Sequence, residues 1–334
     1  MKPGKHRLHR IYKVAAAIAL GAAIAPAPLS TANAQAPAEA PQTSASEETG
    51  ATEASLDPNE AYAAFQRGLY LKAAARALRL AETGNVPSMT LLGELYFEGL
   101  GVIQNKETAA KWYQQAAEAG DRHAQFALGV MQLQGDGVRE NKESGIKWLE
   151  MAAEQNHAAA AYEMGLIYTT GTERPRDIEK AADFFTRSAA LNNAEAQYAL
   201  GTLYIEGAGV EQDEVRGAQL IGLAAENGLS DAQLEYAILV FRGEGVAKSE
   251  ETAAAWFRRA AEGGNPVAQN RLARVLAAGR GTEQDLIEAM TWHLMARERG
   301  VSDAWLDGMM ASLSPDELNT VRKKAVEFGR PWGG

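Results

Sequence analysis

Few residues of this chain have the type and spacing that catalysis needs. Ser144-Gly145-Ile146-Lys147 matches the Ser-x-x-Lys pattern of penicillin-recognising enzymes, in which the serine is the nucleophile. The Ser-Asp-Asn and Lys-Thr-Gly patterns that accompany it there are missing. A pattern with two fixed letters arises by chance, and serine is ordinary in the first turn of a helix. A β-lactam-directed or cell-wall enzyme is therefore kept as the alternative, and labelling of Ser144 by a β-lactam would favour it.

Metal and histidine chemistry is equally sparse. Beyond the N-terminal segment the histidines are His123, His157 and His293, and they form no His-x-x-x-His pair and no cluster with carboxylates. His293 occupies a position that packing residues fill elsewhere in the chain, so we expect it to be half-buried. The chain has no cysteine, which excludes disulfides, thiol catalysis and cysteine metal sites. We predict that the protein is not an enzyme and binds no cofactor or metal.

The first 34 residues have the pattern of a signal peptide. A basic region that ends at Lys13 precedes an apolar run, 14–25, and Ala32-Asn33-Ala34 fits the small-x-small cleavage rule. Residues 35–56 are rich in Ala, Pro, Ser, Thr and Glu, which indicates a disordered linker. No lipobox cysteine is present, so we expect no lipid anchor. We predict a periplasmic or secreted protein cleaved near Ala34; the alternative is an apolar run that stays uncleaved as a membrane anchor.

The charge that remains after this cleavage is strongly negative. Five of the 33 basic residues lie in the signal peptide, which leaves 28 − 43 = −15. A chain of this charge does not neutralise phosphates, so nucleic acid and anionic membrane surfaces are not expected as partners.

The rest of the chain repeats itself every 36 residues, with no insertion or deletion over six copies. One position holds Gly93, Gly129, Gly165, Gly201, Ala237 and Ala273, and another holds Gly99, Gly135, Gly171, Gly207, Gly243 and Gly279. A third, mostly aromatic position holds Trp112, Trp148, Phe184, Leu220, Trp256 and Trp292. Self-similarity at this period, with helical spacing inside each copy, predicts an all-α solenoid.

Each copy carries start and stop signals for two helices, here named helix A and helix B. Helix A contains a glycine that needs a packing reason and ends at a Gly-x-Gly-Val turn. Helix B begins after a favoured capping residue, namely Asn105, Asn141, Asp177, Asp213, Ser249 or Asp285. We predict a shortened helix pair over 57–85, six repeats over 86–300 and capping helices over 301–334. The third repeat lacks the second glycine and the valine, so its turn should differ.

These motifs resemble the Sel1-like repeat family, which is related to the tetratricopeptide repeats. The first full copy shows the match in Leu92-Gly93, Tyr96, Gly99, Gly101, Val102, Ala109, Trp112, Tyr113, Ala116, Ala117 and Gly120. The resemblance implies a right-handed α-solenoid of antiparallel helix pairs. It also implies an adaptor role in protein assemblies, and exported bacterial members include regulators of envelope signalling and of surface-polysaccharide or cell-wall assembly. A cysteine-rich secreted subfamily linked to β-lactam binding does not fit a chain without cysteine.

The resemblance places helix A on the concave side, which leaves a surface as the candidate site. We predict a protein-binding face centred on Phe126, Val130, Leu133, Tyr162, Leu166, Tyr198, Ile205, Leu234, Ile238 and Phe241. Acidic residues flank it, namely Glu94, Glu98, Glu195, Glu206 and Asp231, which favours a partner segment with basic and apolar residues. Two alternatives stay open: the aromatic residues pack between repeats, or they bind a glycan. We predict a scaffold, adaptor or regulator of an envelope process that binds a protein partner.

Overall fold

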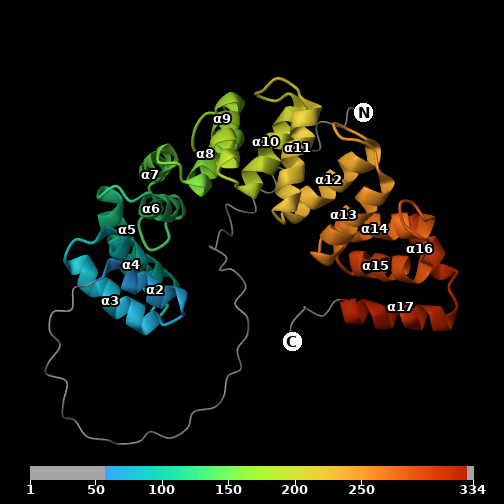
Figure 1. The fold of residues 1–334 in the computed structure, drawn as a ribbon, viewed down its shortest axis with the longest axis horizontal. Coiled ribbons are helices and arrows are strands. Elements are labelled where there is room, and N and C mark those ends of the chain that lie inside the picture. The colour runs from blue at the N-terminus through green and yellow to red at the C-terminus, as the bar shows by residue number, and fades with distance from the viewer. Residues whose placement is uncertain (1–56, 329–334) are drawn as a thin grey trace, which may run out of the picture. The chain divides into compact units, whose positions relative to one another are not determined.

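The computed structural model describes residues 57–328. The predicted signal peptide, the predicted linker and residues 329–334 lie outside this range. Within it, the regular secondary structure is entirely α-helical, and the two helices of each repeat pack against each other as a hairpin (Figure 1). The described residues fall into two compact units, an N-terminal unit of residues 57–157 and a C-terminal unit of residues 158–328. Each unit is described separately.

The N-terminal unit contains three helix hairpins. The helices are α2 (Pro58–Gln66), α3 (Tyr70–Glu82), α4 (Val86–Glu98), α5 (Lys106–Glu118), α6 (Arg122–Gln134) and α7 (Lys142–Glu154). Its core is built from small residues and from leucine: Ala73, Ala77 and Leu95 are completely buried. Alanine at these positions lets the helix axes approach closely, because a single methyl group separates the backbones.

The C-terminal unit contains four such hairpins and a closing pair. Its helices are α8 (Ala158–Thr170), α9 (Ile178–Ala190), α10 (Ala194–Glu206), α11 (Glu214–Glu226), α12 (Ser230–Arg242), α13 (Glu250–Glu262), α14 (Pro266–Ala278), α15 (Leu286–Glu298), α16 (Ala304–Ala311) and α17 (Pro315–Phe328). The short α16 and the polar α17 end the stack, and α17 packs against α15 through buried Val321 and Ala325.

The predicted helix starts are confirmed. Each of the six capping residues named above accepts a hydrogen bond from the backbone N–H three residues later; the distance is 2.9 Å for Asp213 and 3.1 Å for Asn141. At α17, Glu317 and Ser314 cap each other: the Ser314 N–H donates to the Glu317 carboxylate at 2.8 Å, and the Glu317 N–H donates to the Ser314 hydroxyl at 3.3 Å. Such reciprocal bonds satisfy N–H groups that the helix itself leaves free.

The recurring glycine of helix A is explained by packing, as the sequence predicted. A Cβ atom at Gly93 would lie 2.5 Å from the ring of Tyr113 in helix B, and one at Gly165 would collide with the ring of Phe185. The missing side chain therefore makes room for the large residue of the partner helix.

The second glycine of the Gly-x-Gly turn has a further role that local sequence did not show. Gly245 has a positive φ of 66°, and a Cβ atom there would collide with the backbone carbonyl of Glu214, at the start of helix B in the preceding repeat. Gly281 meets Glu250 in the same way. Each of these turns therefore rests on the backbone of the neighbouring repeat.

A row of buried glutamines also joins successive helices and was not predicted. The side-chain amides of Gln125, Gln233 and Gln269 each donate to a carbonyl near the end of the preceding helix B at 3.2 Å. The last carbonyls of a helix have no partner inside it, so this row stabilises the junction between repeats. The signal was visible as a glutamine that follows the recurring alanine of helix A in several copies.

Candidate protein-binding site

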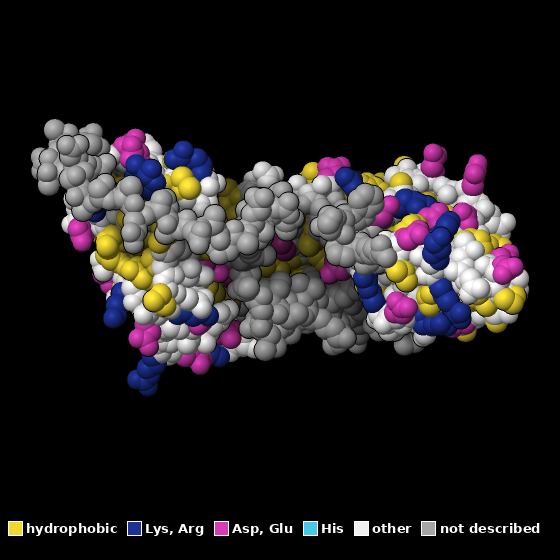
Figure 2. All heavy atoms as spheres, turned by 90° about the horizontal axis from the view of Figure 1, so that it is seen from below, with side chains coloured by type: hydrophobic (Ala, Val, Ile, Leu, Met, Phe, Trp, Pro, Cys, Tyr) yellow, Lys and Arg dark blue, Asp and Glu magenta, His cyan; other side chains and the backbone are white. Residues whose placement is uncertain are grey.

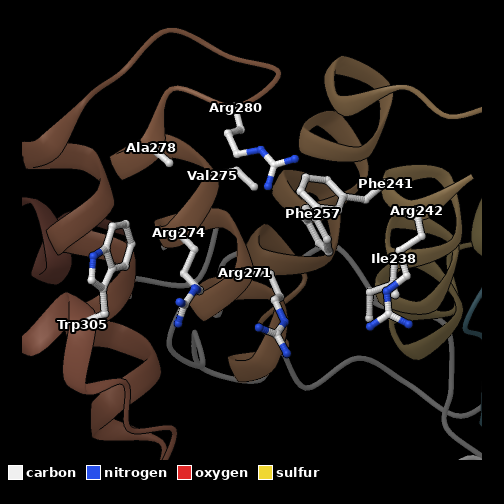
Figure 3. A pocket seen from close by; sticks show the side chains of 10 residues that line it. All are labelled: Ile238, Phe241, Arg242, Phe257, Arg271, Arg274, Val275, Ala278, Arg280 and Trp305. Carbon is white, nitrogen blue, oxygen red and sulfur yellow. The ribbon is translucent and has the colours of Figure 1, made fainter. Parts of the chain in front are cut away.

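The C-terminal unit has a pocket on the side of helices α12, α14 and α16. Its volume is about 360 Å³. The apolar lining residues are Ile238, Phe241, Phe257, Val275, Ala278 and Trp305, and the basic ones are Arg242, Arg271, Arg274 and Arg280 (Figure 3). The pocket is thus an apolar hollow surrounded by guanidinium groups, and no acidic residue lines it.

Arg280 is held from two sides. Its guanidinium carbon lies 4.4 Å from the centre of the Phe241 ring, and its Nε donates to the Glu250 carboxylate at 3.1 Å, with a second bond from a terminal nitrogen to the same carboxylate. The hydrogen bond raises the pKa of Arg280 and lowers that of Glu250. Stacking and pairing together fix the direction of this side chain.

Arg274 is fixed in the same manner by residues at the start of α16. Its guanidinium donates to Asp303 at 2.6 Å and lies 5.1 Å from the centre of the Trp305 ring. Burial of Asp303 opposes ionisation, but the hydrogen bonds from Asn270 and Arg274 outweigh it, so the pKa of this carboxyl lies below its usual value. Asp303 also caps α16 through the backbone N–H of Trp305, at 3.2 Å.

Arg271 and Arg242 are less constrained. Arg242 lies at the end of α12 and is 3.5 Å from the carboxylate of Glu244. Arg271 is exposed on α14, between Arg274 and Arg242 in the close-up view (Figure 3), and its side chain has no hydrogen bond or ion pair within residues 57–328. All five of its N–H donors are therefore free to bind an oxygen acceptor outside these residues.

The ten residues of the predicted binding face divide into buried and half-buried groups. Tyr162, Leu166, Tyr198 and Leu234 are buried, so they offer little surface; Tyr162 lies 5.8 Å from Phe185, between ring centres. Half-buried positions are held by Phe126, Val130, Leu133, Ile205, Ile238 and Phe241. In the N-terminal unit Phe126 stacks on His157, with ring centres 4.6 Å apart. Only Ile238 and Phe241 from the predicted set line the pocket.

Sequence reasoning missed the arginines, although one signal was present. Arg274 occupies the repeat position that Val130, Leu166 and Ile238 fill in other copies. None of the five residues of the expected acidic flank lines this pocket, although Asp231 lies on α12. Glu94, in the N-terminal unit, accepts a hydrogen bond from the Tyr113 hydroxyl at 3.3 Å. Burial and the nearby Glu98 raise the pKa of Glu94. In the pocket of the C-terminal unit the charged lining residues are all arginines, three of which pair with carboxylates beside it. A space-filling view shows basic, acidic and hydrophobic side chains interspersed over the C-terminal helices (Figure 2).

The expectation for His293 was wrong. This residue is completely buried, and its Nε2 lies 2.8 Å from the Asp307 carboxylate. The pair was invisible in sequence because the partners lie on different helices, α15 and α16. Asp307 also lies 3.5 Å from Arg297, so the cluster ties α16 to α15.

The remaining chemical leads gain no support. Ser144 lies in the first turn of α7, where its N–H donates to Asn141, and Lys147 contacts Glu143 at 3.5 Å. Over residues 57–328 no three His, Asp or Glu side chains gather in a way that could hold a metal ion. Within the same range, no helix has both the length and the apolarity of a membrane span.

The fold and its periodic contacts define a helical-repeat protein of the solenoid class. The Sel1 repeat model matches residues 86–121, 122–157, 158–193, 194–229, 230–265 and 266–301. The chain belongs to the Sel1 repeat family, as its motifs indicated, and such repeats generally act as protein–protein interaction modules.

Two solved structures support this assignment. The chain is similar to c5321, a protective antigen of uropathogenic Escherichia coli with an SLR fold, at 29% identity and a TM-score of 0.70; the match covers 81% of this chain but only 62% of c5321. It is similar to a Sel1 repeat protein from Oxalobacter formigenes at 33% identity and a TM-score of 0.66, over 72% of this chain and 99% of that protein. No curated protein matches the chain.

Proposed function

We propose that the protein is a periplasmic scaffold or adaptor that binds a protein partner of an envelope process through the helix A side of its repeats. The observation that carries this proposal is the pocket on α12, α14 and α16, which exposes aromatic and aliphatic side chains beside free hydrogen-bond donors. Aromatic residues and arginine are the side chains that contribute most to protein interfaces. The signal-peptide pattern of residues 1–34 supports the periplasmic location.

Photo-crosslinking in cells tests the use of this face. A photoreactive phenylalanine replaces Ala278, which is exposed in the pocket, and in a second strain it replaces Ala255, which is exposed on α13. Both changes start from an exposed alanine in a helix, so they form a matched pair. We expect discrete crosslinked species from position 278 and few from position 255, identified by mass spectrometry.

The same strains test the location. After osmotic shock the protein should appear in the periplasmic fraction, with an N-terminus close to Gln35 by sequencing. Equal crosslinking at both positions, or a protein retained in the cytoplasm, would contradict the proposal.

A further inference from the structure

We propose that the pocket on α12, α14 and α16 recognises an acidic segment of the protein partner, in which carboxylates flank an aromatic or large aliphatic side chain. This inference rests on the proposed function and adds the chemistry of the partner. The pocket, and not the chain as a whole, determines that chemistry, because short-range contacts decide what binds in a hollow of this size.

The charged residues that line the pocket are basic, whereas the chain as a whole is acidic. The chain beyond residue 34 carries −15 in formal charge, yet all four charged residues that line the pocket are arginines. Charges elsewhere on the surface are screened over about 8 Å at physiological salt. The carboxylates of Glu244, Asp303 and Glu250 offset Arg242, Arg274 and Arg280 at close range. The uncompensated positive charge of the pocket is therefore that of Arg271, with which an acidic side chain would pair.

The acidic neighbours bind only some of the N–H donors of these arginines. A guanidinium has five N–H donors. Arg274 gives one hydrogen bond to Asp303, and Arg280 uses two nitrogens on Glu250, while Arg271 has no partner within the described residues. Free donors thus remain around the hollow, and carboxylates match the fork of a guanidinium in geometry.

Two of the four arginines are also held in place before anything binds. Arg274 stacks on Trp305, and Arg280 stacks on Phe241. Side chains that are already ordered lose less entropy when they bind a partner. This preorganisation favours a specific contact over a diffuse electrostatic one.

The apolar lining decides between a peptide and a simple anion. Six of the ten lining residues are apolar, and Trp305 remains 45% exposed. A bare phosphate or an acetate ion would leave this surface in contact with water. A segment that places an aromatic or aliphatic side chain between carboxylates covers the apolar surface and pairs the arginines at once.

Panning of a random peptide library on the protein, purified after expression of the full-length sequence, tests the inference. We expect enriched peptides to combine Asp or Glu with an aromatic or large aliphatic residue. Arg271→Glu should weaken their binding by about tenfold or more, because it replaces a charge-assisted hydrogen bond with repulsion. Arg259→Glu on α13 is the matched control: Arg259 is exposed and lies outside the pocket. Thermal melts confirm that both variants fold.

The outcomes separate this inference from the proposed function. Enrichment of basic or neutral peptides, or no enrichment, would overturn the acidic partner, while crosslinking from position 278 could still support the use of this face. Equal loss in both arginine variants would also overturn it. If the peptides bind only after deletion of residues 35–56, which contain four glutamates, the occupant is this chain's own linker and not a partner.

Discussion

Glycine has two distinct roles in the repeats, and the difference can be measured. In helix A, Gly93 and Gly165 make room for an aromatic ring of the partner helix. In the turn, Gly245 supplies a positive φ and also lets the backbone of one repeat rest on the next. Local sequence predicts the positive φ of the turn. It does not predict the backbone contact, because that contact depends on a residue about 30 positions earlier in the chain.

The first prediction compares two turn glycines. Gly245→Ala should lower the free energy of unfolding by about 2–4 kcal/mol, because a positive φ costs roughly 1–2 kcal/mol for alanine and the new methyl group also collides with the Glu214 carbonyl. Gly228→Ala is the control: its φ is 90° but a Cβ atom there meets nothing within 4 Å. Gly228→Ala should lower the free energy of unfolding only by the roughly 1–2 kcal/mol of the positive φ. Thermal melts followed by circular dichroism give both values, and equal losses would refute the contact.

The second prediction concerns pH. Burial raises the pKa of Glu163, on α8, from 4.5 to about 7. An acid with a raised pKa in the folded state favours folding in its neutral form, so its contribution is present below pH 4.5 and is lost as pH rises through 7. Glu163→Gln should therefore become more stable relative to the unmodified protein between pH 5 and pH 8, by on the order of 1–2 kcal/mol. A stability difference that does not change with pH would contradict this assignment.

Whole helices are positioned by signals that repeat in register, which explains why their bounds were predictable. Capping residues such as Asp213 and the closing Gly207 mark the ends of each helix in sequence, and the structure confirms them. The buried glutamine row and the His293–Asp307 pair were not predicted, since both join different helices. Their geometry is set by tertiary packing and not by local propensity.

The third prediction concerns the closing helix of the C-terminal unit. Truncation after Leu313 removes α17, whose Val321 and Ala325 are buried and whose Phe328 lies 5.1 Å from Trp292 between ring centres. The loss exposes the apolar side of α15, so the amides of α14 and α15 should exchange hydrogen faster. Those of α8 to α10 should change little, because each repeat contacts mainly its neighbours. Uniform loss of protection across the unit would show instead that it unfolds as one cooperative body.

For the molecule as a whole, sequence was sufficient for the fold class and insufficient for the site. The 36-residue period and the capping residues specify stacked helix hairpins. Because these signals recur over six copies, an exception in one copy does not change the prediction. The pocket depends instead on departures from the repeat: Arg274 stands where other copies carry Val130 or Ile238, and Trp305 comes from the irregular final copy. A search for residues that recur at the same position in every copy overlooks such residues. In a repeat protein, the residues that break the pattern are therefore the ones to examine for function.

The contact between turns such as that of Gly245 and the backbone of the preceding repeat has a consequence for how such a chain can change in length. Gly209 rests on Ile178 and Gly245 rests on Glu214, which occupy the same place in successive copies. If residues 194–229 were excised, Gly245 would take the place of Gly209 against Ile178. Side-chain contacts would still change, because Tyr236 would meet Thr186 in place of Gly222. A whole repeat can therefore be removed without changing the spacing of these backbone contacts, whereas loss of one residue between Glu214 and Gly245 would alter the contact that spans it.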